Sequence, residues 1–141
     1  MPELFHFSSP DETILFAQRF ARCLKPNDLI LLTGDLGAGK TTFVKGIAQG
    51  LGSSDLIQSP TYVYLQIYEA NIPIFHFDLY RIRQESDFLA MGFEEYFTKN
   101  GVTLIEWPER ISSLPLSHAF HVRLSVISEN ERTVLISKGI S

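Results

Sequence analysis

The sequence has almost no cysteine and no long apolar run, and these absences exclude several kinds of protein. Cys23 is the only cysteine among 141 residues, so we expect neither an internal disulfide nor a metal site built from several cysteines. The longest strictly aliphatic run, Leu29 to Leu32, is far shorter than the roughly 20 residues of a membrane-spanning helix. The first residues lack the basic and then apolar segments of a signal peptide. These absences predict a cytoplasmic protein with no membrane contact and no disulfide partner.

A basic stripe of the kind that binds nucleic acid is also missing. Twelve Lys and Arg are scattered among sixteen Asp and Glu, which gives a net charge of −4. If the function involves RNA, we therefore expect other proteins to hold it. The length favours a single domain over residues 1–141 with one core, and the chain contains no repeat or low-complexity segment.

One motif names a ligand directly. The segment Gly34-Asp-Leu-Gly-Ala-Gly-Lys-Thr41 matches the P-loop pattern G-x-x-x-x-G-K-[ST] at every fixed position. Backbone N–H groups of such a loop, and of the helix that follows it, favour an anion. Lys40 can reach the outer phosphates of a nucleotide, and the Thr41 hydroxyl can hold magnesium. Residues 34–41, called the P-loop below, therefore predict a site for phosphate and magnesium.

The hydrophobic pattern predicts strands and helices around this loop. An unbroken apolar run at 28–33 is typical of a buried parallel strand, and apolar residues at helical spacing over 43–51 predict a helix after the loop. Ser9, Pro10 and Glu12 form the pattern of a helix start, with Ser9 as N-cap and Glu12 closing a capping box. We also expect a short strand at 4–7, a hairpin of strands 62–68 and 72–77, helix in two pieces over 79–97 with a break at Met91-Gly92, a buried strand at 102–105, and a C-terminal hairpin from residue 120. The prediction is an α/β fold of the P-loop NTPase type, with a mainly parallel sheet flanked by helices and extended by antiparallel strands.

Two carboxylates are candidates to complete the magnesium site. Asp78 and Glu106 each follow a predicted strand, and ligands of open α/β sheets gather at the carboxyl ends of strands. Asp78 could instead be the N-cap of a helix that starts at Leu79. Glu106 has a weaker alternative, because glutamate is a poor cap and a buried unpaired carboxylate is costly.

Two further residues, Trp107 and Thr61, each leave two interpretations open, whereas His76 has one. Trp107, the only tryptophan, is either a core anchor or a flat surface near a nucleotide base. Thr61, in Ser59-Pro60-Thr61, could sense the terminal phosphate or orient water, or it could lie in a plain turn. His76 alternates with apolar residues and is expected to be a half-buried histidine with satisfied hydrogen bonds.

Together the motifs resemble the TsaE family. They are Gly34-Asp-Leu-Gly-Ala-Gly-Lys-Thr-Thr42, Ser59-Pro-Thr-Tyr62, His76-Phe-Asp-Leu-Tyr-Arg81 and Ile105-Glu-Trp-Pro-Glu109. The family consists of bacterial P-loop ATPases that serve the threonylcarbamoyl modification of an adenosine beside the tRNA anticodon. Four motifs in order make this likeness far more specific than the P-loop alone.

The resemblance implies ATP and Mg²⁺ as ligands and assigns residues to them. Thr41 and Glu106 would hold magnesium, Asp78 would act at the γ-phosphate or its water, and Thr61 would belong to a switch-like segment. Trp107 would lie near the base, and Glu12 could approach the nucleotide, although its capping role explains it equally well. A nucleotide contact from late residues such as Arg132 is left open, because the C-terminal region is short and ends soon after Ile136. The phosphates would be wrapped by Gly37, Ala38, Gly39, Lys40, Thr41 and Thr42.

The resemblance also implies a partner, a heterodimer of the threonylcarbamoyl transferase and its paralogue. ATP hydrolysis would reset or remodel that complex between cycles, and tRNA would be contacted only indirectly. A small-molecule kinase is one alternative, for which Arg81 and Arg83 are the only clustered lid arginines. A nucleotide-gated binding module with incidental hydrolysis is another. A GTPase is disfavoured, because the chain has no Asn-Lys-x-Asp stretch.

Overall fold

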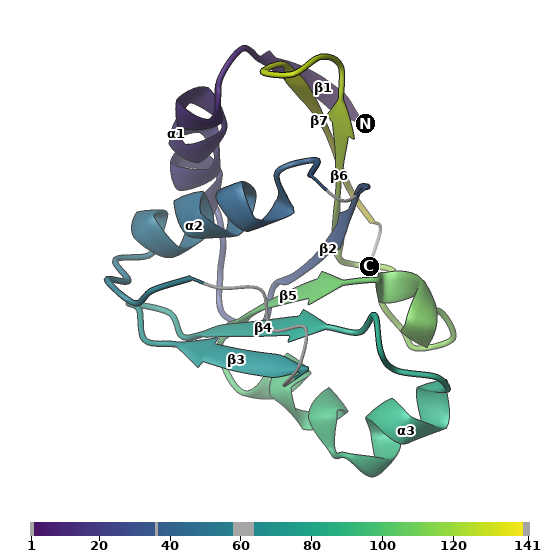
Figure 1. The fold of residues 1–141 in the computed structure, drawn as a ribbon. Helices are drawn as coiled ribbons and strands as arrows, with labels where there is room; N and C mark the ends of the chain where they lie inside the picture. The colour runs from purple at the N-terminus through teal and green to yellow at the C-terminus, as the bar shows by residue number, and fades with distance from the viewer. Residues whose placement is uncertain (1, 36, 58–63, 140–141) are drawn as a thin grey trace.

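The computed structural model describes residues 2–35, 37–57 and 64–139, and every strand in these ranges belongs to one mixed sheet (Figure 1). The order across this seven-stranded sheet is β1-β7-β6-β2-β5-β4-β3. Neighbours among β6, β2, β5 and β4 are parallel, whereas β1, β7 and β3 pair antiparallel at the two sides. This arrangement confirms the predicted α/β class. The strands are β1 (Glu3–Phe7), β2 (Leu29–Thr33), β3 (Leu65–Tyr68), β4 (Ile74–Asp78), β5 (Val102–Glu106), β6 (Phe120–Val126) and β7 (Arg132–Lys138).

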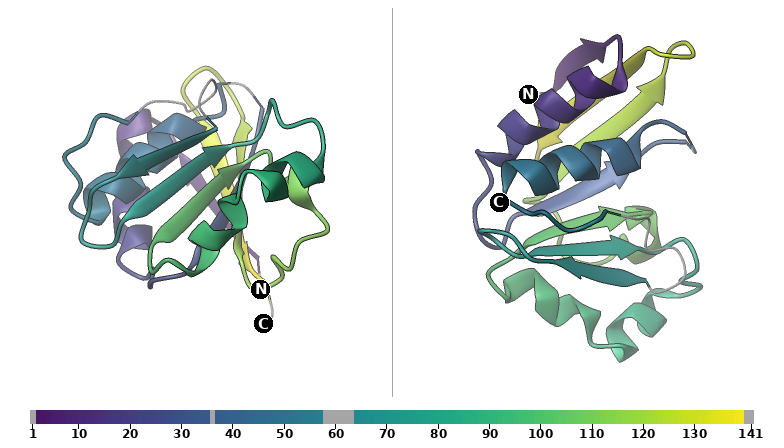
Figure 2. Two further views of the ribbon diagram at one scale, coloured as in Figure 1. Left: turned by 90° about the horizontal axis from the view of Figure 1, so that it is seen from below. Right: turned by 60° about the vertical axis from the view of Figure 1, so that its left-hand side comes forward.

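Helices cover both faces of the sheet. The two longer helices, α1 (Pro10–Ala21) and α2 (Lys40–Gly50), lie side by side on one face (Figures 1 and 2). The short helix α3 (Glu85–Ala90) and the 3₁₀ helices η1 (Phe93–Thr98) and η2 (Pro108–Ile111) lie on the other face, over β2, β5 and β4. Each layer has its own hydrophobic core, so the strand ends at the P-loop are held rigidly from both sides.

The start of α1 follows the sequence pattern closely. The Ser9 hydroxyl accepts a hydrogen bond from the Glu12 backbone N–H at 3.3 Å, and Pro10 occupies the first turn. The Glu12 carboxylate accepts a hydrogen bond from the Ser8 N–H at 2.7 Å, one residue before the N-cap. Glu12 is therefore engaged in capping α1.

Close contact between α1 and α2 depends on glycine. A Cβ atom added at Gly46 would lie 2.5 Å from the Ala17 Cβ and 2.7 Å from the Ile14 carbonyl oxygen. At Gly50 it would lie 2.6 Å from the Gln18 carbonyl oxygen. The obstacles include backbone atoms, so the two helices would have to separate to admit a side chain.

We expect Gly46→Ala to lower the free energy of unfolding by about 1–3 kcal/mol, because it overpacks this contact. Alanine favours a helix over glycine by only about 1 kcal/mol, which is too little to offset the clash. Urea unfolding followed by circular dichroism measures the change. Lys45→Ala, at an exposed position of the same helix, is the control and should leave stability nearly unchanged. A Gly46→Ala protein as stable as the original would contradict the packing argument.

The helix expected over 79–97 is wrong in its first part. Leu79 and Ile82 are buried in the second core, and the Leu79 N–H donates to the Glu106 carbonyl at 3.1 Å. This bond continues the pairing of β4 with β5. Residues 80–81 form a turn, residues 82–84 have no regular secondary structure, and α3 begins only at Glu85. The predicted break is present, since Gly92 adopts φ +73° between α3 and η1.

Candidate functional site

The P-loop leaves β2 at the middle of the sheet and leads into α2. Gly34, Gly37 and Gly39 have φ values of +147°, +82° and +101°, which side chains other than hydrogen rarely tolerate. A Cβ atom at Gly34 would lie 2.6 Å from the Leu124 carbonyl oxygen, so β6 presses directly against the loop. The result is a tight turn that ends at the N-terminus of α2, the geometry that favours a bound phosphate.

Two P-loop residues are already fixed by internal contacts. The Lys40 Nζ donates to the Gly34 carbonyl oxygen at 2.8 Å and lies 4.0 Å from the Glu106 Oε1. The Ala38 side chain is fully buried, and its N–H donates to the Asp35 carbonyl oxygen at 3.0 Å. Ala38 thus shapes the loop from within, while Lys40 connects it to the end of β5.

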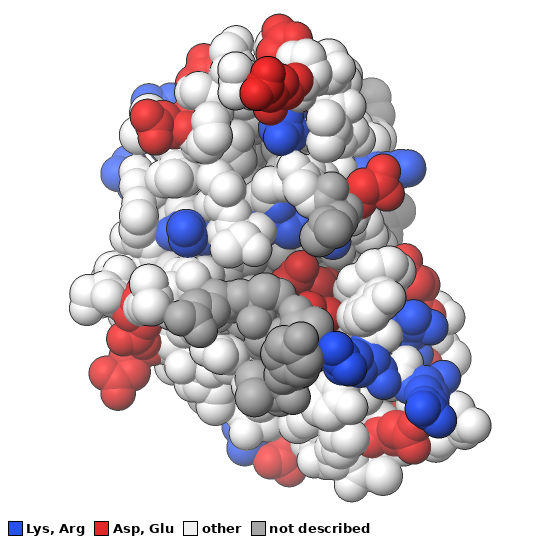
Figure 3. Space-filling view, in the orientation of Figure 1, with Lys and Arg blue, Asp and Glu red and all other residues white. Residues whose placement is uncertain are grey.

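A cleft of about 800 Å³ joins the P-loop to the ends of β4 and β5. Acidic and basic side chains meet in a hollow near the middle of the face shown in Figure 3. The cleft brings together most of the residues singled out from the sequence. Its walls are formed by Gly34, Asp35, Gly37, Gly39, Lys40, Thr41, Thr42, Asp78, Tyr80, Glu106 and Trp107.

The two candidate carboxylates lie side by side. Asp78 and Glu106 are register partners at the last positions of the parallel strands β4 and β5, and each is only 5% exposed. The Asp78 Oδ1 accepts a hydrogen bond from the Tyr80 N–H at 3.0 Å. No helix of the described residues begins at Leu79, so the N-cap interpretation of Asp78 is wrong.

A buried hydrogen-bonded chain supports Glu106 from below. The His76 Nε2 lies 2.8 Å from the Glu106 Oε2, and the His76 Nδ1 lies 3.0 Å from the Tyr68 hydroxyl. His76 is completely buried, so the prediction of a half-buried histidine is wrong. One sequence pattern could have indicated that His76 lies near the carboxylates. His76 and Asp78 stand two residues apart in a strand, so their side chains face the same side of the sheet.

Trp107 lies beside the amine of the P-loop lysine. Its backbone is left-handed, with φ 60° and ψ 51°, an uncommon conformation for a bulky residue. The indole centre lies 5.7 Å from the Lys40 Nζ, 5.0 Å from the Tyr80 ring and 5.7 Å from the Arg110 Cζ. Trp107 is therefore held at the lysine end of the cleft.

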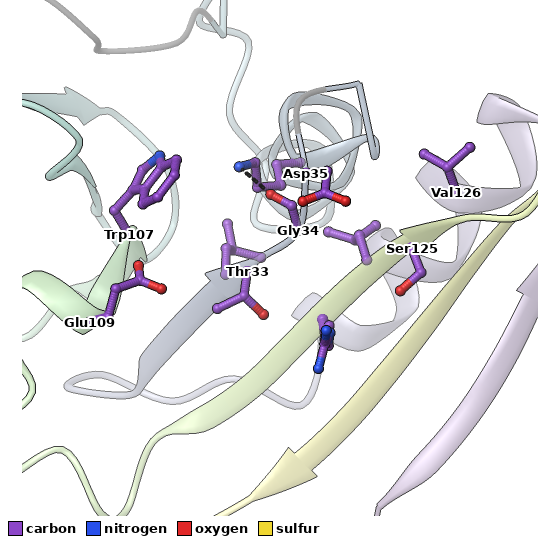
Figure 4. Close-up of a pocket in the computed structure, with 11 residues that line it drawn as sticks. Thr33, Gly34, Asp35, Trp107, Glu109, Ser125 and Val126 are labelled. Carbon is purple, nitrogen blue, oxygen red and sulfur yellow. Dashed lines mark hydrogen bonds between the residues drawn. The ribbon is translucent and has the colours of Figure 1, made fainter.

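A smaller pocket of about 290 Å³ adjoins the cleft and shares Lys40 and Trp107 with it. Figure 4 shows Trp107 and Glu109 on one side and Ser125 and Val126 on the other, with Thr33 and Gly34 between them. The pocket extends the lysine end of the cleft toward β6.

The opposite end of the cleft runs past Gly37 to a pocket of about 110 Å³ between α1 and the turn from β6 to β7. The Arg132 Nη2 donates to the Gly37 carbonyl oxygen at 3.2 Å, which ties this turn to the P-loop. The sequence left open whether Arg132 contacts a nucleotide. The pocket is lined by Pro10, Thr13, Gly37, Gly39, Thr42, Glu129, Asn130 and Arg132.

Among the described residues, two predicted site residues, Glu12 and Ala38, do not line the cleft. Glu12 is exposed, lines none of these pockets, and uses its carboxylate at the start of α1. Thr61 lies outside the described residues.

The oxygen atoms at the cleft fit a magnesium ion that is bound partly by the protein and partly by the phosphate of a nucleotide. Thr41 and Glu106 supply a hydroxyl and a carboxylate, the oxygen ligands that Mg²⁺ prefers. Within the described ranges, no group of three or more His, Cys, Asp or Glu side chains could hold a metal ion alone. Magnesium sites of nucleotide enzymes usually take one or two protein ligands and fill the rest with phosphate oxygens and water.

Comparison with known proteins gives a consistent result. The family model "Threonylcarbamoyl adenosine biosynthesis protein TsaE" matches residues 7–134. The TsaE protein of Rickettsia typhi is 44% identical over 133 residues, which cover 93% of this chain and 92% of that protein. The TsaE protein of Bacillus subtilis is 39% identical over 127 residues, covering 89% of this chain and 79% of that protein. Both relatives are described as tRNA threonylcarbamoyladenosine biosynthesis proteins.

A solved structure shares the fold. The crystal structure of YdiB from Bacillus subtilis has a TM-score of 0.84 and 32% sequence identity. The match covers 99% of this chain and 87% of that one. None of the helices in the described part of the chain has the length and apolar character to cross a membrane.

Proposed function

The chain belongs to the TsaE family of tRNA threonylcarbamoyladenosine biosynthesis, and we propose that it serves this pathway as a magnesium-dependent ATPase. One observation carries the proposal. A glycine-rich anion cradle, the Lys40 amine and two buried carboxylates line a single cleft. This combination suits a nucleotide whose terminal phosphate bond is to be broken.

The nucleotide lies along the cleft with its terminal phosphate at Lys40. P-loop lysines reach the β- and γ-phosphates, so the base extends to the other end, toward Arg132 and the start of α1. The pocket there shares Gly37, Gly39 and Thr42 with the cleft, which supports this direction. On this orientation Trp107 shields the terminal phosphate rather than the base.

Each polar residue then has a defined task. Lys40 neutralises charge on the outer phosphates, and the N–H groups of residues 37–42 hold the phosphate chain. Thr41 and Glu106 hold the magnesium ion, which when bound offsets the charge of the phosphates. Asp78, beside Glu106, acts at the γ-phosphate or its attacking water. Thr61 is proposed to belong to a segment that responds to the nucleotide.

The working partner is proposed to be a heterodimer of the threonylcarbamoyl transferase and its paralogue. ATP hydrolysis resets or remodels that complex between cycles, in the cytoplasm, and the transfer itself takes place in the partner. The net charge of −4 and the mixed charges of the face in Figure 3 support indirect contact with tRNA.

Reconstituted threonylcarbamoyl transfer, with and without this protein, tests the proposal. We expect single-turnover transfer to proceed without it and repeated turnover to require both the protein and hydrolysable ATP. Repeated cycles with a non-hydrolysable ATP analogue would instead indicate a nucleotide-gated binding module. Phosphoryl transfer to an added metabolite, independent of partner proteins, would indicate a kinase.

Trp107 provides a direct test of the nucleotide's direction, because it is the only tryptophan and its fluorescence needs no label. We expect ATP to change its emission more than ADP does, and adenosine to change it little, because the indole lies beside Lys40. Titration with the three ligands at fixed magnesium measures the difference. A full change with adenosine alone would place the base at Trp107 and contradict the orientation.

A further inference from the structure

The hydrogen-bonded chain beneath Glu106 lies outside the cleft wall and has no part in the tasks assigned above. Tyr68 on β3, His76 on β4 and Glu106 on β5 span three neighbouring strands. Neither Tyr68 nor His76 lines the cleft, and both are buried. We propose that His76 is a positioning residue that orients Glu106 for magnesium, with Tyr68 stabilising the imidazole tautomer. This inference rests on the proposed role of Glu106 in nucleotide binding.

The donors and acceptors allow one arrangement with a neutral imidazole. A carboxylate oxygen only accepts, so the His76 Nε2 at 2.8 Å from the Glu106 Oε2 must carry the proton. The His76 Nδ1 then accepts, and the Tyr68 hydroxyl at 3.0 Å donates to it. The carboxylate of Glu106 thus selects the tautomer, and the Tyr68 hydroxyl stabilises it by donating to Nδ1.

As a consequence, the two carboxylate oxygens of Glu106 have different roles. Oε2 is held by His76, whereas Oε1 faces the Lys40 Nζ at 4.0 Å, on the wall of the cleft. A carboxylate held by one oxygen cannot swing about its side-chain torsions, so the other oxygen is presented to a ligand in one direction. Partners of this kind commonly contribute about 10- to 100-fold to metal affinity or activity.

The tautomer can be observed without nucleotide, metal or partner. Long-range ¹H–¹⁵N correlation spectra of protein labelled with ¹⁵N-histidine distinguish an Nε2–H from an Nδ1–H imidazole. We expect the His76 ring to carry a proton on Nε2, facing Glu106, and Tyr68→Phe to make the Nε2–H tautomer less dominant. An Nδ1–H tautomer in the unsubstituted protein would overturn the inference whatever the fate of the ATPase proposal.

Magnesium dependence tests the functional consequence. We compare His76→Phe, which keeps a ring but no donor, with His76→Gln, whose amide can still donate toward Glu106. Nucleotide affinity is measured by Trp107 fluorescence, first with EDTA and then as magnesium is added. We expect His76→Phe to raise the magnesium concentration for half-maximal effect by about 10- to 100-fold. His76→Gln should need a magnesium concentration close to that of the unsubstituted protein. His121→Gln, at an exposed histidine of β6, is the matched control.

The outcomes separate positioning from general damage and from failure of the ATPase proposal. A positioning role changes the magnesium dependence and leaves nucleotide affinity in EDTA unchanged. Equal loss of affinity in EDTA and in magnesium would mean that His76 only supports the fold, and would overturn the inference. Unchanged magnesium dependence in both His76 variants would overturn it too. If the unsubstituted protein responds to nucleotide but not to magnesium, the assignment of Glu106 as a metal ligand is what fails.

Discussion

Replacing Lys40 with alanine is expected to lower ATP hydrolysis by about 10²- to 10³-fold, the usual cost of losing one preorganised donor to developing charge. The amine is held by the Gly34 carbonyl oxygen at 2.8 Å and lies at the cleft wall, so it is in place before the phosphates arrive. No other lysine or arginine lines the cleft of about 800 Å³ among the described residues. Phosphate release, measured alone and with the partner heterodimer, shows the loss.

The control for this experiment lies on the same helix. Lys45 is exposed and lines none of the pockets at the P-loop, so Lys45→Ala removes the same charge without touching the cleft. Its hydrolysis rate should match that of the unsubstituted protein. If Lys40→Ala also hydrolyses ATP at the original rate, the cleft is not the site of hydrolysis.

The parts of the fold and site that the sequence predicts are those with local causes. The P-loop pattern specifies a turn, a helix start and a lysine within eight neighbouring residues, and in the structure Gly37 and Gly39 adopt positive φ values that suit such a turn. The start of α1 depends only on residues 8–12 and was also predictable. Asp78 and Glu106 lie at the same edge because parallel strands share a carboxyl edge, which the sequence predicts, and they are direct neighbours because β4 pairs with β5.

The parts that the sequence does not predict depend on register and on strand order. Tyr68, His76 and Glu106 meet only because β3 and β5 flank β4 in one particular alignment. Arg132 reaches Gly37 because β6 joins the sheet beside β2, although the two strands are far apart in the chain. A hydrophobic pattern determines which face of a strand is buried, but it does not determine which strands lie beside it in the sheet.

The orientation of the Trp107 side chain is a third feature that the sequence does not predict. The sequence places it directly after Glu106 and leaves open a core anchor or a surface near the base. Its left-handed backbone sets the indole centre 5.7 Å from the Lys40 Nζ, and φ at a single bulky residue cannot be inferred from motif spacing. The position of one side chain thus changes which end of a nucleotide it is proposed to contact.

Glu106→Gln is expected to reduce magnesium-dependent hydrolysis by about 10²- to 10³-fold, because it removes the charge that holds the metal and keeps the shape of the side chain. The amide oxygen can still accept the hydrogen bond from His76, so the chain beneath the cleft is retained. Phosphate release over a range of magnesium concentrations measures the effect. Glu94→Gln, at an exposed glutamate of η1, is the matched control and should behave like the unsubstituted protein.

The same variant separates catalysis from stability. Asp78 and Glu106 are paired across adjacent strands and are each 5% exposed, so their negative charges repel at close range. Removing one charge relieves that repulsion and weakens the attraction to Lys40 at 4.0 Å, and these opposing changes leave the ligand-free melting temperature nearly unchanged. Mg-ATP at about 100 times its Kd stabilises the unsubstituted protein by about 2.7 kcal/mol, and we expect most of this gain to disappear in Glu106→Gln. A large drop in ligand-free melting temperature would instead attribute the lost activity to misfolding.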